Sequence, residues 1–366
     1  MPPTAASPSA TPKAGAACDV VVIGDGVVGL STALELARAG VRCHVLGARR
    51  PGAASSAAAG ILAPNIGVMT SDLRALFRAS LALYPEYLAP LQTIDPGLKL
   101  LSGLIEVLHE HSLVDDHHLQ LEQRTLDTLQ PGVLAPYGAV LHETDAAIDS
   151  VRLVTVLRRA IELQQHITYV TDDAVSISPR TGSVSVKTRS GGSVEAATAV
   201  VAAGAWSSMI DGLPRSLPIR PLKGQMLSLG ASVLTRPVMA GHVYLVPRGD
   251  ETIVGATSEE AGFDTVVHSE TVESLHRSAS ALVPALLSAP IARTWAGIRP
   301  ATPDLLPIID RDPDEPCVVY AAGHSRNGIL LAPLTAVSVA ELVQGQPPSF
   351  DIRQFSVGRF AREQHQ

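Results

Sequence analysis

The chain has 366 residues, which fits about two domains of roughly 150 residues each. Apolar residues make up 46% and charged residues 17%, a composition that excludes a disordered protein. The net charge of -7 argues against a nucleic-acid partner held on a broad basic face, because such binding is mostly phosphate neutralisation.

Other features bear on where the protein works. No apolar run reaches the roughly 18 residues of a membrane-spanning helix, so no membrane segment is expected. The three cysteines, Cys18, Cys43 and Cys317, are too few for a disulfide framework and have no C-x-x-C spacing. Residues 1–17 are mostly Pro, Ser, Thr and Ala and lack the apolar segment of a signal peptide. We predict a disordered tail there and a cytoplasmic chain.

Order is predicted to begin at residue 19 with a strand, a helix and a second strand. Residues 20–23 are an apolar run, typical of a strand buried on both faces of a parallel sheet. Residues 30–38 carry apolar side chains at helical spacing, and Gly40 can end this helix. Residues 41–46 are the second strand, so the chain opens with a βαβ unit.

Further along the chain, helical and strand-like patterns alternate. Helices are predicted over most of 71–129, and over 151–165, 272–283 and 328–343. Strands are predicted over 184–188, 197–202 and 317–322, with a hairpin of 243–246 and 252–256. The last strand and helix are similar in character to the first pair. We therefore expect them to return to the first domain, with a second domain inserted between.

A glycine motif, Gly24-x-Gly26-x-x-Gly29, lies between the first strand and its helix. Gly24 permits a tight turn, Gly26 lets the backbone approach a pyrophosphate, and Gly29 lets the helix pack close to the strand. The free N–H groups at the start of the helix then face the anion. In this context the motif predicts a dinucleotide site, and the alternative is a glycine-rich turn without a ligand.

The residue after the second strand departs from this motif. An acidic residue is expected there to bind a ribose hydroxyl, but the chain has Gly47. Arg49 and Arg50 follow closely, and a missing acid beside arginines favours the 2′-phosphate of NADP. A solvated loop explains the two arginines equally well, so both alternatives stay open at this point.

Further segments rich in small and apolar residues carry a family resemblance. They are 54–64 (ASSAAAGILAP), 200–206 (VVAAGAW), 244–248 (YLVPR), 255–257 (GAT), 295–302 (WAGIRPAT) and 322–333 (AGHSRNGILLAP). Together with the glycine motif they resemble the D-amino acid oxidase family of FAD-dependent oxidoreductases, and most closely its glycine oxidase branch. The resemblance runs in order from about residue 19 to residue 343, and it favours FAD over NADP.

The resemblance implies an α/β fold (α+β overall) with two domains. One is a Rossmann-like, doubly wound FAD-binding domain made of residues 18–90, 146–213 and 296–345. The other is a substrate-binding domain with a mostly antiparallel β-sheet, made of residues 91–145 and 214–295. Residues 346–366 are then a C-terminal extension.

The resemblance also assigns residues to the substrate. Arg299 matches the arginine that holds the substrate carboxylate, a task that suits the two parallel hydrogen bonds of a guanidinium. Tyr244 matches a tyrosine that supports the same carboxylate, and His242 and Arg326 match other pocket residues. The alternatives are a surface arginine at Arg299 and a core tyrosine at Tyr244.

FAD is the implied cofactor, and it is expected to bind noncovalently, since no pattern around Cys317 supports attachment. The implied FAD contacts are Gly24, Gly26, Val27, Val28, Gly29, Ala54, Ser55, Ala59, Gly60, Ile61, Val175, His324, Ser325, Arg326, Asn327, Gly328, Ile329 and Leu330. Relatives often have an aromatic residue at the position of Ser325. This difference predicts a pocket that admits substrates larger than glycine.

The implied activity is oxidative deamination of glycine, sarcosine and small D-amino acids by molecular oxygen. The products are the oxoacid, ammonia or an amine, and hydrogen peroxide, and in many bacteria this reaction feeds thiamine biosynthesis. The alternatives are an FAD-dependent dehydrogenase of D-amino acids or secondary amines, an NADP-binding reductase, and a non-catalytic dinucleotide-binding protein. Relatives are often tetramers, which implies a homo-oligomer, although the sequence carries no interface pattern.

A polar cluster at 109–118 offers one more alternative, a metal site. It contains His109, Glu110, His111, Asp115, Asp116, His117 and His118. An H-x-H followed by D-D-H-H matches no structural zinc pattern. A solvated turn explains these residues better, so we predict no metal site.

Overall fold

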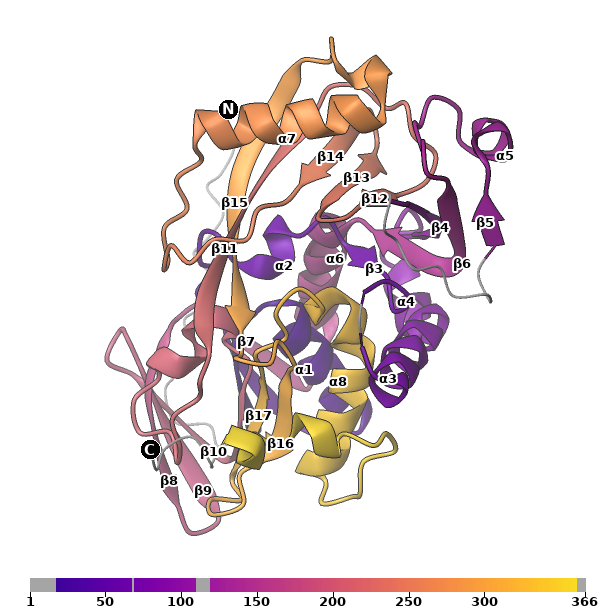
Figure 1. The fold of residues 1–366 in the computed structure, drawn as a ribbon. Helices are drawn as coiled ribbons and strands as arrows, with labels where there is room; N and C mark the ends of the chain where they lie inside the picture. The colour runs from indigo at the N-terminus through magenta and orange to yellow at the C-terminus, as the bar shows by residue number, and fades with distance from the viewer. Residues whose placement is uncertain (1–17, 68, 110–118, 361–366) are drawn as a thin grey trace, which may run out of the picture.

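The computed structural model describes residues 18–67, 69–109 and 119–360, and these residues form two β-sheets with helices beside them (Figure 1). The long strands β11 (Arg220–Leu229) and β15 (Ile291–Ala301) run from the upper sheet toward the lower one (Figure 1). The fold is therefore mixed α/β, as the sequence predicts.

The first sheet is mainly parallel. Its strand order is β16-β17-β10-β1-β2-β7, with parallel pairs from β17 through to β7 and an antiparallel pair of β16 with β17. A hairpin of β8 and β9 continues antiparallel from β10. The strands are β1 (Cys18–Ile23), β2 (Cys43–Leu46), β7 (Ile167–Val170), β8 (Ala174–Arg180), β9 (Ser183–Thr188), β10 (Ser193–Val201), β16 (Ile308–Arg311) and β17 (Val318–Ala322).

Strand β1 is buried on both faces, which its apolar sequence predicts. Val20 and Val22 pack among helices, whereas Val21 and Ile23 pack on the opposite face beside β8 and β9. The helices of the first face are α1 (Val27–Arg38), α3 (Ser71–Ala82), α4 (Tyr84–Gln92), α6 (Ser150–Leu163) and α8 (Gly328–Val343). Helix α8 packs against α1, so the end of the chain returns to its beginning as expected.

The second sheet is mainly antiparallel, in the order β15-β11-β14-β13-β12-β4-β6-β3 with β5 beside β6. Its remaining strands are β3 (Ile61–Leu62), β4 (Leu100–Val107), β5 (Leu119–Leu121), β6 (Ala139–Ile148), β12 (Val238–Ala240), β13 (Val243–Arg248) and β14 (Glu251–Gly255). The other helical segments are α2 (Ala54–Ala57), α5 (Gln123–Leu129), α7 (Ser269–Leu282), η1 (Gly204–Met209), η2 (Pro284–Leu286), η3 (Arg353–Phe355) and η4 (Val357–Phe360). None of the described helices is long and apolar enough to cross a membrane.

The prediction of a mostly helical stretch over 71–129 is wrong at β4 and β5, whereas α3, α4 and α5 are helices as predicted. Gly103 in β4 has a φ of 80°, which lies outside the helical region. The β-branched Ile105 and Val107 are buried against the second sheet's core. Strand β4 pairs with β6, a distant partner that local residue spacing does not reveal.

Two strands run across the predicted domain boundaries. β6 spans the boundary at residue 146, and β15 spans the boundary at residue 296. β3, inside the first predicted FAD segment, pairs with β6 of the second sheet. These shared strands connect the two regions closely, and the division into domains stays a prediction.

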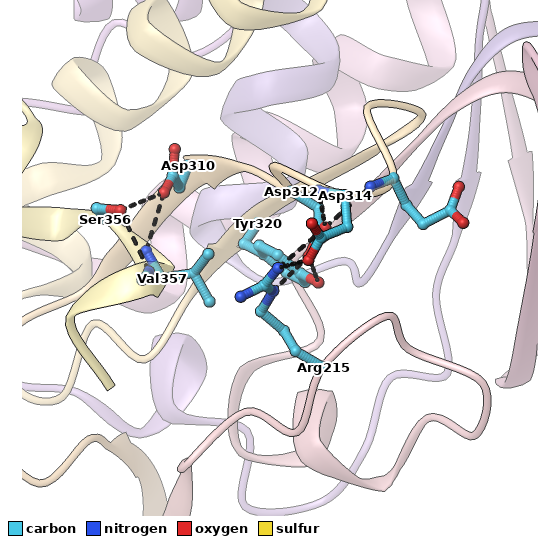
Figure 2. A network of polar contacts seen from close by, with 9 residues as sticks. Arg215, Asp310, Asp312, Asp314, Tyr320, Ser356 and Val357 are labelled. Atoms are coloured by element: carbon cyan, nitrogen blue, oxygen red, sulfur yellow. Dashed lines mark hydrogen bonds and ion pairs between the residues drawn. The ribbon is translucent and has the colours of Figure 1, made fainter. Parts of the chain in front are cut away.

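The C-terminal segment is attached to the first sheet by hydrogen bonds to β16 (Figure 2). The carboxylate of Asp310 accepts hydrogen bonds from Ser356 Oγ at 2.6 Å and from the Val357 N–H at 3.0 Å. Val357 also packs in the core on that side of the sheet. Residues 353–360 therefore belong to the folded body.

A second group of contacts in the same view surrounds the buried carboxylate of Asp312 (Figure 2). It accepts hydrogen bonds from Arg215 Nε at 2.6 Å and from the Tyr320 hydroxyl at 2.7 Å. Two backbone N–H groups, of Asp314 and Glu315, donate to its other oxygen. Burial alone would raise the pKa of Asp312, but the hydrogen bonds from Arg215, Tyr320 and the backbone hold it below its usual range.

Replacing Arg215 by methionine is expected to lower the free energy of unfolding by about 3 kcal/mol at pH 7, because it leaves a buried carboxylate without its cation. Since folding lowers the pKa of Asp312, this stability is present above the unfolded pKa and is lost as the pH falls through the folded value. The difference between Arg215→Met and the parent should therefore shrink in acid. Denaturant unfolding over a pH series measures both effects.

The matched control for this prediction is Arg353→Met. Arg353 pairs with Asp351, but the two side chains are 89% and 59% exposed. Water already solvates such a pair, so its loss should leave unfolding almost unchanged. An equal loss of stability in both variants would show that burial of Asp312 is not the cause.

Candidate active site

A cavity of about 860 Å³ opens where the carboxyl ends of β1 and β10 face the second sheet. This volume lies in the range of sites that enclose a cofactor. The structure brings every predicted site residue to its wall except Gly29 and Leu330. Leu330 lies in α8 and is buried in the helical core, and Gly29 lies in the first turn of α1 against Gly24.

The turn from β1 into α1 leaves a backbone surface open to the cavity. Gly24 has a φ of 121°, and a Cβ there would overlap the carbonyl oxygen of Ala202. A Cβ at Gly29 would overlap the carbonyl oxygen of Gly24, so this residue lets helix and strand approach as predicted. Helix α1 has no acidic residue in its first turn, which leaves its N-terminus suited to an anion. These residues fit the pyrophosphate of a dinucleotide.

The small-residue run after β2 lies along the same cavity. The Val27 N–H donates to Ser55 Oγ at 3.0 Å, so the run is held at the N-terminus of α1. Trp295 Nε1 donates to the carbonyl of Ala57 at 2.9 Å, which fixes the run to β15 on its other side. A Cβ at Gly60 would overlap the backbone of Ile148. Larger residues would separate these elements and narrow the cavity.

The last motif turns sharply into α8. Ser325 has a φ of 48° and lies buried at the cavity wall, and its N–H donates to the carbonyl of Pro300 at 2.9 Å. Gly328 and Ile329 begin α8 and line the cavity, so the first free N–H groups of this long helix open there. Such a helix start stabilises negative charge.

His324 in this motif is buried and uncharged. It is 3% exposed, and its Nε2 lies 3.0 Å from the Thr335 hydroxyl. Burial lowers the pKa of His324 to about 3, so its imidazole is neutral near pH 7. A cationic role at neutral pH therefore does not fit this residue, and so low a pKa makes it a weak base.

Arg299 points from β15 into the cavity without a carboxylate partner. Its Nη1 donates to the carbonyl of Thr257 at 2.9 Å, and it forms no ion pair with any described residue. Gly224 on the paired strand β11 makes room for it, because a Cβ there would stand 2.6 Å from both terminal nitrogens. The cavity thus contains a half-buried guanidinium whose charge is available to an anion.

Tyr244 lies beside Arg299, and a glycine on the paired strand makes room for its side chain as well. It faces Gly255 across the β13–β14 pair, and a Cβ at Gly255 would stand 2.5 Å from its hydroxyl. Burial raises the pKa of Tyr244, and the nearby Arg299 offsets only part of that rise. The hydroxyl therefore stays protonated and can donate a hydrogen bond to a carboxylate.

His242 and Arg326 both line the cavity and are exposed. His242 directly precedes β13, and Arg326 lies two residues before α8. The prediction of both as pocket residues stays a prediction, because neither forms a contact that fixes a role. Val175 also lines the cavity, and its carbonyl accepts a hydrogen bond from the Asp211 N–H at 3.0 Å.

Several lining residues were not predicted from the sequence. Asp172 and Asp173 follow β7, Trp206 follows β10, and Gly224 lies on β11. The carboxyl ends of parallel strands share one edge of a sheet, so a predicted strand at 167–170 would have indicated the two aspartates.

The contacts of Arg50 weaken the NADP alternative. Its Nη2 lies 2.8 Å from the Asp173 carboxylate, and its guanidinium stacks 5.0 Å from the ring centre of Trp206. Its charge is thus compensated within the protein. Arg49 does not line the cavity and lies over the ring of Tyr169.

The described residues offer no group of three His, Cys, Asp or Glu that could hold a metal ion. Of the polar cluster at 109–118, only His109 lies within the described residues, so the prediction for the rest falls outside them. The three cysteines are unpaired and buried, and none of them lines the cavity.

Comparison with known proteins agrees with this geometry. Residues 19–342 match the family model described as FAD dependent oxidoreductase (DAO). The chain is 33% identical to the bifunctional protein ThiO/ThiG of Trichormus variabilis. The match covers 94% of this chain and 55% of that protein. It thus spans about half the length of the bifunctional relatives it matches.

The chain also matches glycine oxidase of Geobacillus kaustophilus over almost the whole length of that protein, in sequence and in structure. The chain is 33% identical to glycine oxidase of Geobacillus kaustophilus, covering 93% of this chain and 97% of that protein. The crystal structure of glycine oxidase from Geobacillus kaustophilus superimposes with a TM-score of 0.86 at 29% identity, over 94% of this chain. This chain therefore belongs to the DAO family of FAD-dependent oxidoreductases.

Proposed function

We propose that this chain is an FAD-dependent oxidase of small amino acids, with glycine, sarcosine and small D-amino acids as its substrates. Glycine, oxygen and water are converted to glyoxylate, ammonia and hydrogen peroxide. The observation that carries this proposal is the guanidinium of Arg299, which faces the cavity without a carboxylate partner among the described residues. The likeness to glycine oxidases supports the same substrate class.

Different residues of the cavity bind the substrate and the cofactor. Arg299 holds the substrate carboxylate by charge-assisted hydrogen bonds, and the protonated Tyr244 adds a neutral donor beside it. When bound, FAD supplies the acceptor for the two electrons that leave the Cα–N unit. The glycine turn of β1–α1 and the N-terminus of α8 provide N–H groups for negative charge.

Positioning and exclusion of water are the protein's main contributions to the chemistry. A substrate held at its carboxylate presents its Cα in one orientation, which replaces a bimolecular encounter by a fixed geometry. His324 is neutral near pH 7 and buried, so it does not compete for the substrate carboxylate. No protein base is needed if the amine of the substrate binds unprotonated.

A peroxide assay tests this proposal. Purified protein loaded with FAD is mixed with glycine, sarcosine, D-alanine, D-proline and larger D-amino acids, and peroxide is measured in each case. We expect turnover with the small substrates, and activity with the larger ones as well, because Ser325 presents a small side chain at the cavity. Turnover that reduces a dye but yields no peroxide would instead assign an FAD-dependent dehydrogenase. No turnover in either assay would contradict an amino acid oxidoreductase.

Three further parts of the proposal do not rest on the cavity. The likeness to bifunctional ThiO/ThiG proteins supports a place in thiamine biosynthesis. A cytoplasmic location and a homo-oligomeric state also stay predictions. Cell fractionation and the mass of the purified protein in solution measure them.

A further inference from the structure

Gly47 stands where an acidic residue is expected to bind the ribose of a dinucleotide. It directly follows β2, whose Leu46 pairs with Ile23 at the end of β1. Its backbone does not adopt the left-handed conformation that favours glycine. The reason for glycine is space, because a Cβ at Gly47 would stand 2.5 Å from Asp25 Cβ and 2.5 Å from the Tyr169 hydroxyl.

The side chain that takes this space is itself a carboxylate. Asp25 lies between Gly24 and Gly26 in the turn after β1, is 9% exposed and lines the cavity. Its Cγ would stand 2.7 Å from a Cβ at Gly47, so the carboxylate is directed toward the end of β2. The chain therefore carries an acid at this edge of the sheet, supplied by β1 and not by β2.

The partners of Asp25 leave one of its oxygens available. Oδ2 accepts hydrogen bonds from the Tyr169 hydroxyl at 2.9 Å and from Arg158 Nη2 at 3.0 Å. Oδ1 accepts no hydrogen bond from the residues that the structure describes. Burial raises the pKa of Tyr169, so its hydroxyl remains a donor. The guanidinium of Arg158 forms an ion pair with Asp25, with 3.0 Å between Nη2 and Oδ2, beside the site that fits a pyrophosphate.

We propose that Asp25 binds the 2′-hydroxyl of the adenosine ribose of FAD through Oδ1, and that Gly47 is glycine to make room for it. Tyr169 and Arg158 orient the carboxylate from β7 and α6. This inference rests on the cofactor of the proposed function and not on its substrate. The test therefore measures cofactor binding, whose failure is distinguishable from absence of amino acid turnover.

The test compares FAD with an analogue whose adenosine ribose lacks the 2′-hydroxyl. Apoprotein is titrated with each compound, and the dissociation constant is read from flavin fluorescence. The parent should bind the analogue about 10- to 100-fold more weakly, as expected for loss of a hydrogen bond to a charged group. Asp25→Ala should bind FAD more weakly than the parent and should bind the two compounds equally.

Two further variants keep the test decisive. Asp172→Ala removes another carboxylate of the cavity wall and should retain the parent's preference for FAD. A triple variant, Asp25→Gly with Tyr169→Phe and Gly47→Glu, removes the side-chain atoms nearest to a Cβ at position 47 and returns the acid to the end of β2. It should regain a preference of similar size, and it keeps the proposal testable if Asp25→Ala does not fold. Equal binding of both compounds by the parent overturns the proposal, as does a preference that survives in Asp25→Ala or disappears in Asp172→Ala.

Discussion

Replacing Arg299 by methionine is expected to raise the KM for glycine about 30- to 1,000-fold while FAD stays bound. The guanidinium has no carboxylate partner among the described residues, so its loss removes the charge-assisted pair with the substrate. Loss of such a pair costs on the order of 2–4 kcal/mol, which gives this range of KM. Steady-state peroxide kinetics measure the change, and the visible spectrum of the purified variant reports the flavin.

Arg293→Met is the matched control, because Arg293 lies on the same strand β15 but is 58% exposed and pairs with Glu251. It should leave the KM for glycine unchanged. Arg299→Lys keeps the charge but loses the forked geometry, so a partial recovery is expected. Parental kinetics in Arg299→Met would show that the substrate carboxylate binds elsewhere.

Replacing Gly24 by alanine is expected to abolish FAD binding, with a loss of affinity of more than about 100-fold. The residue has a φ of 121°, and its Cβ would overlap the backbone carbonyl of Ala202, directly after the neighbouring strand β10. Backbone cannot yield as a flexible side chain does, so the turn before α1 must shift away from its position. The variant should purify without the flavin absorbance near about 450 nm.

Gly40→Ala separates this effect from the cost of an unusual backbone angle. Gly40 follows α1 with a φ of 78°, but a Cβ there meets nothing within 4 Å. It should lose about 1 kcal/mol of stability from the left-handed conformation and keep its flavin. Loss of flavin in both variants would mean that strain alone, and not close approach at Gly24, decides binding.

The opening βαβ unit and the last helix could be predicted because their signals are local. Glycine after β1, helical spacing of apolar residues and a glycine near the end of α1 are all read from neighbouring positions. The predicted helix 328–343 has the bounds of α8. Strands β4, β6 and β7 were missed, since their stability comes from partners far along the chain.

For the site, too, local motifs could be predicted from the sequence, whereas contacts between distant strands could not. Residues inside motifs, such as Arg299 and Ser325, could be assigned from the family resemblance, and the structure brings them to one cavity. Gly224 could not be found, because its importance arises only when β11 pairs with β15 and Arg299 crosses it. The relation of Asp25 to Gly47 likewise depends on the pairing of β1 with β2.

The central claim is that the cavity oxidises an amine whose carboxylate is held by Arg299. Anaerobic mixing of the FAD-loaded protein with glycine, and separately with methylamine, tests it directly, because the two amines differ by the carboxylate alone. We expect glycine to bleach the flavin band near about 450 nm, and methylamine to bleach it far more slowly at equal concentration. Equal rates with the two amines, or no bleaching by glycine and the other small amino acids, would contradict the account.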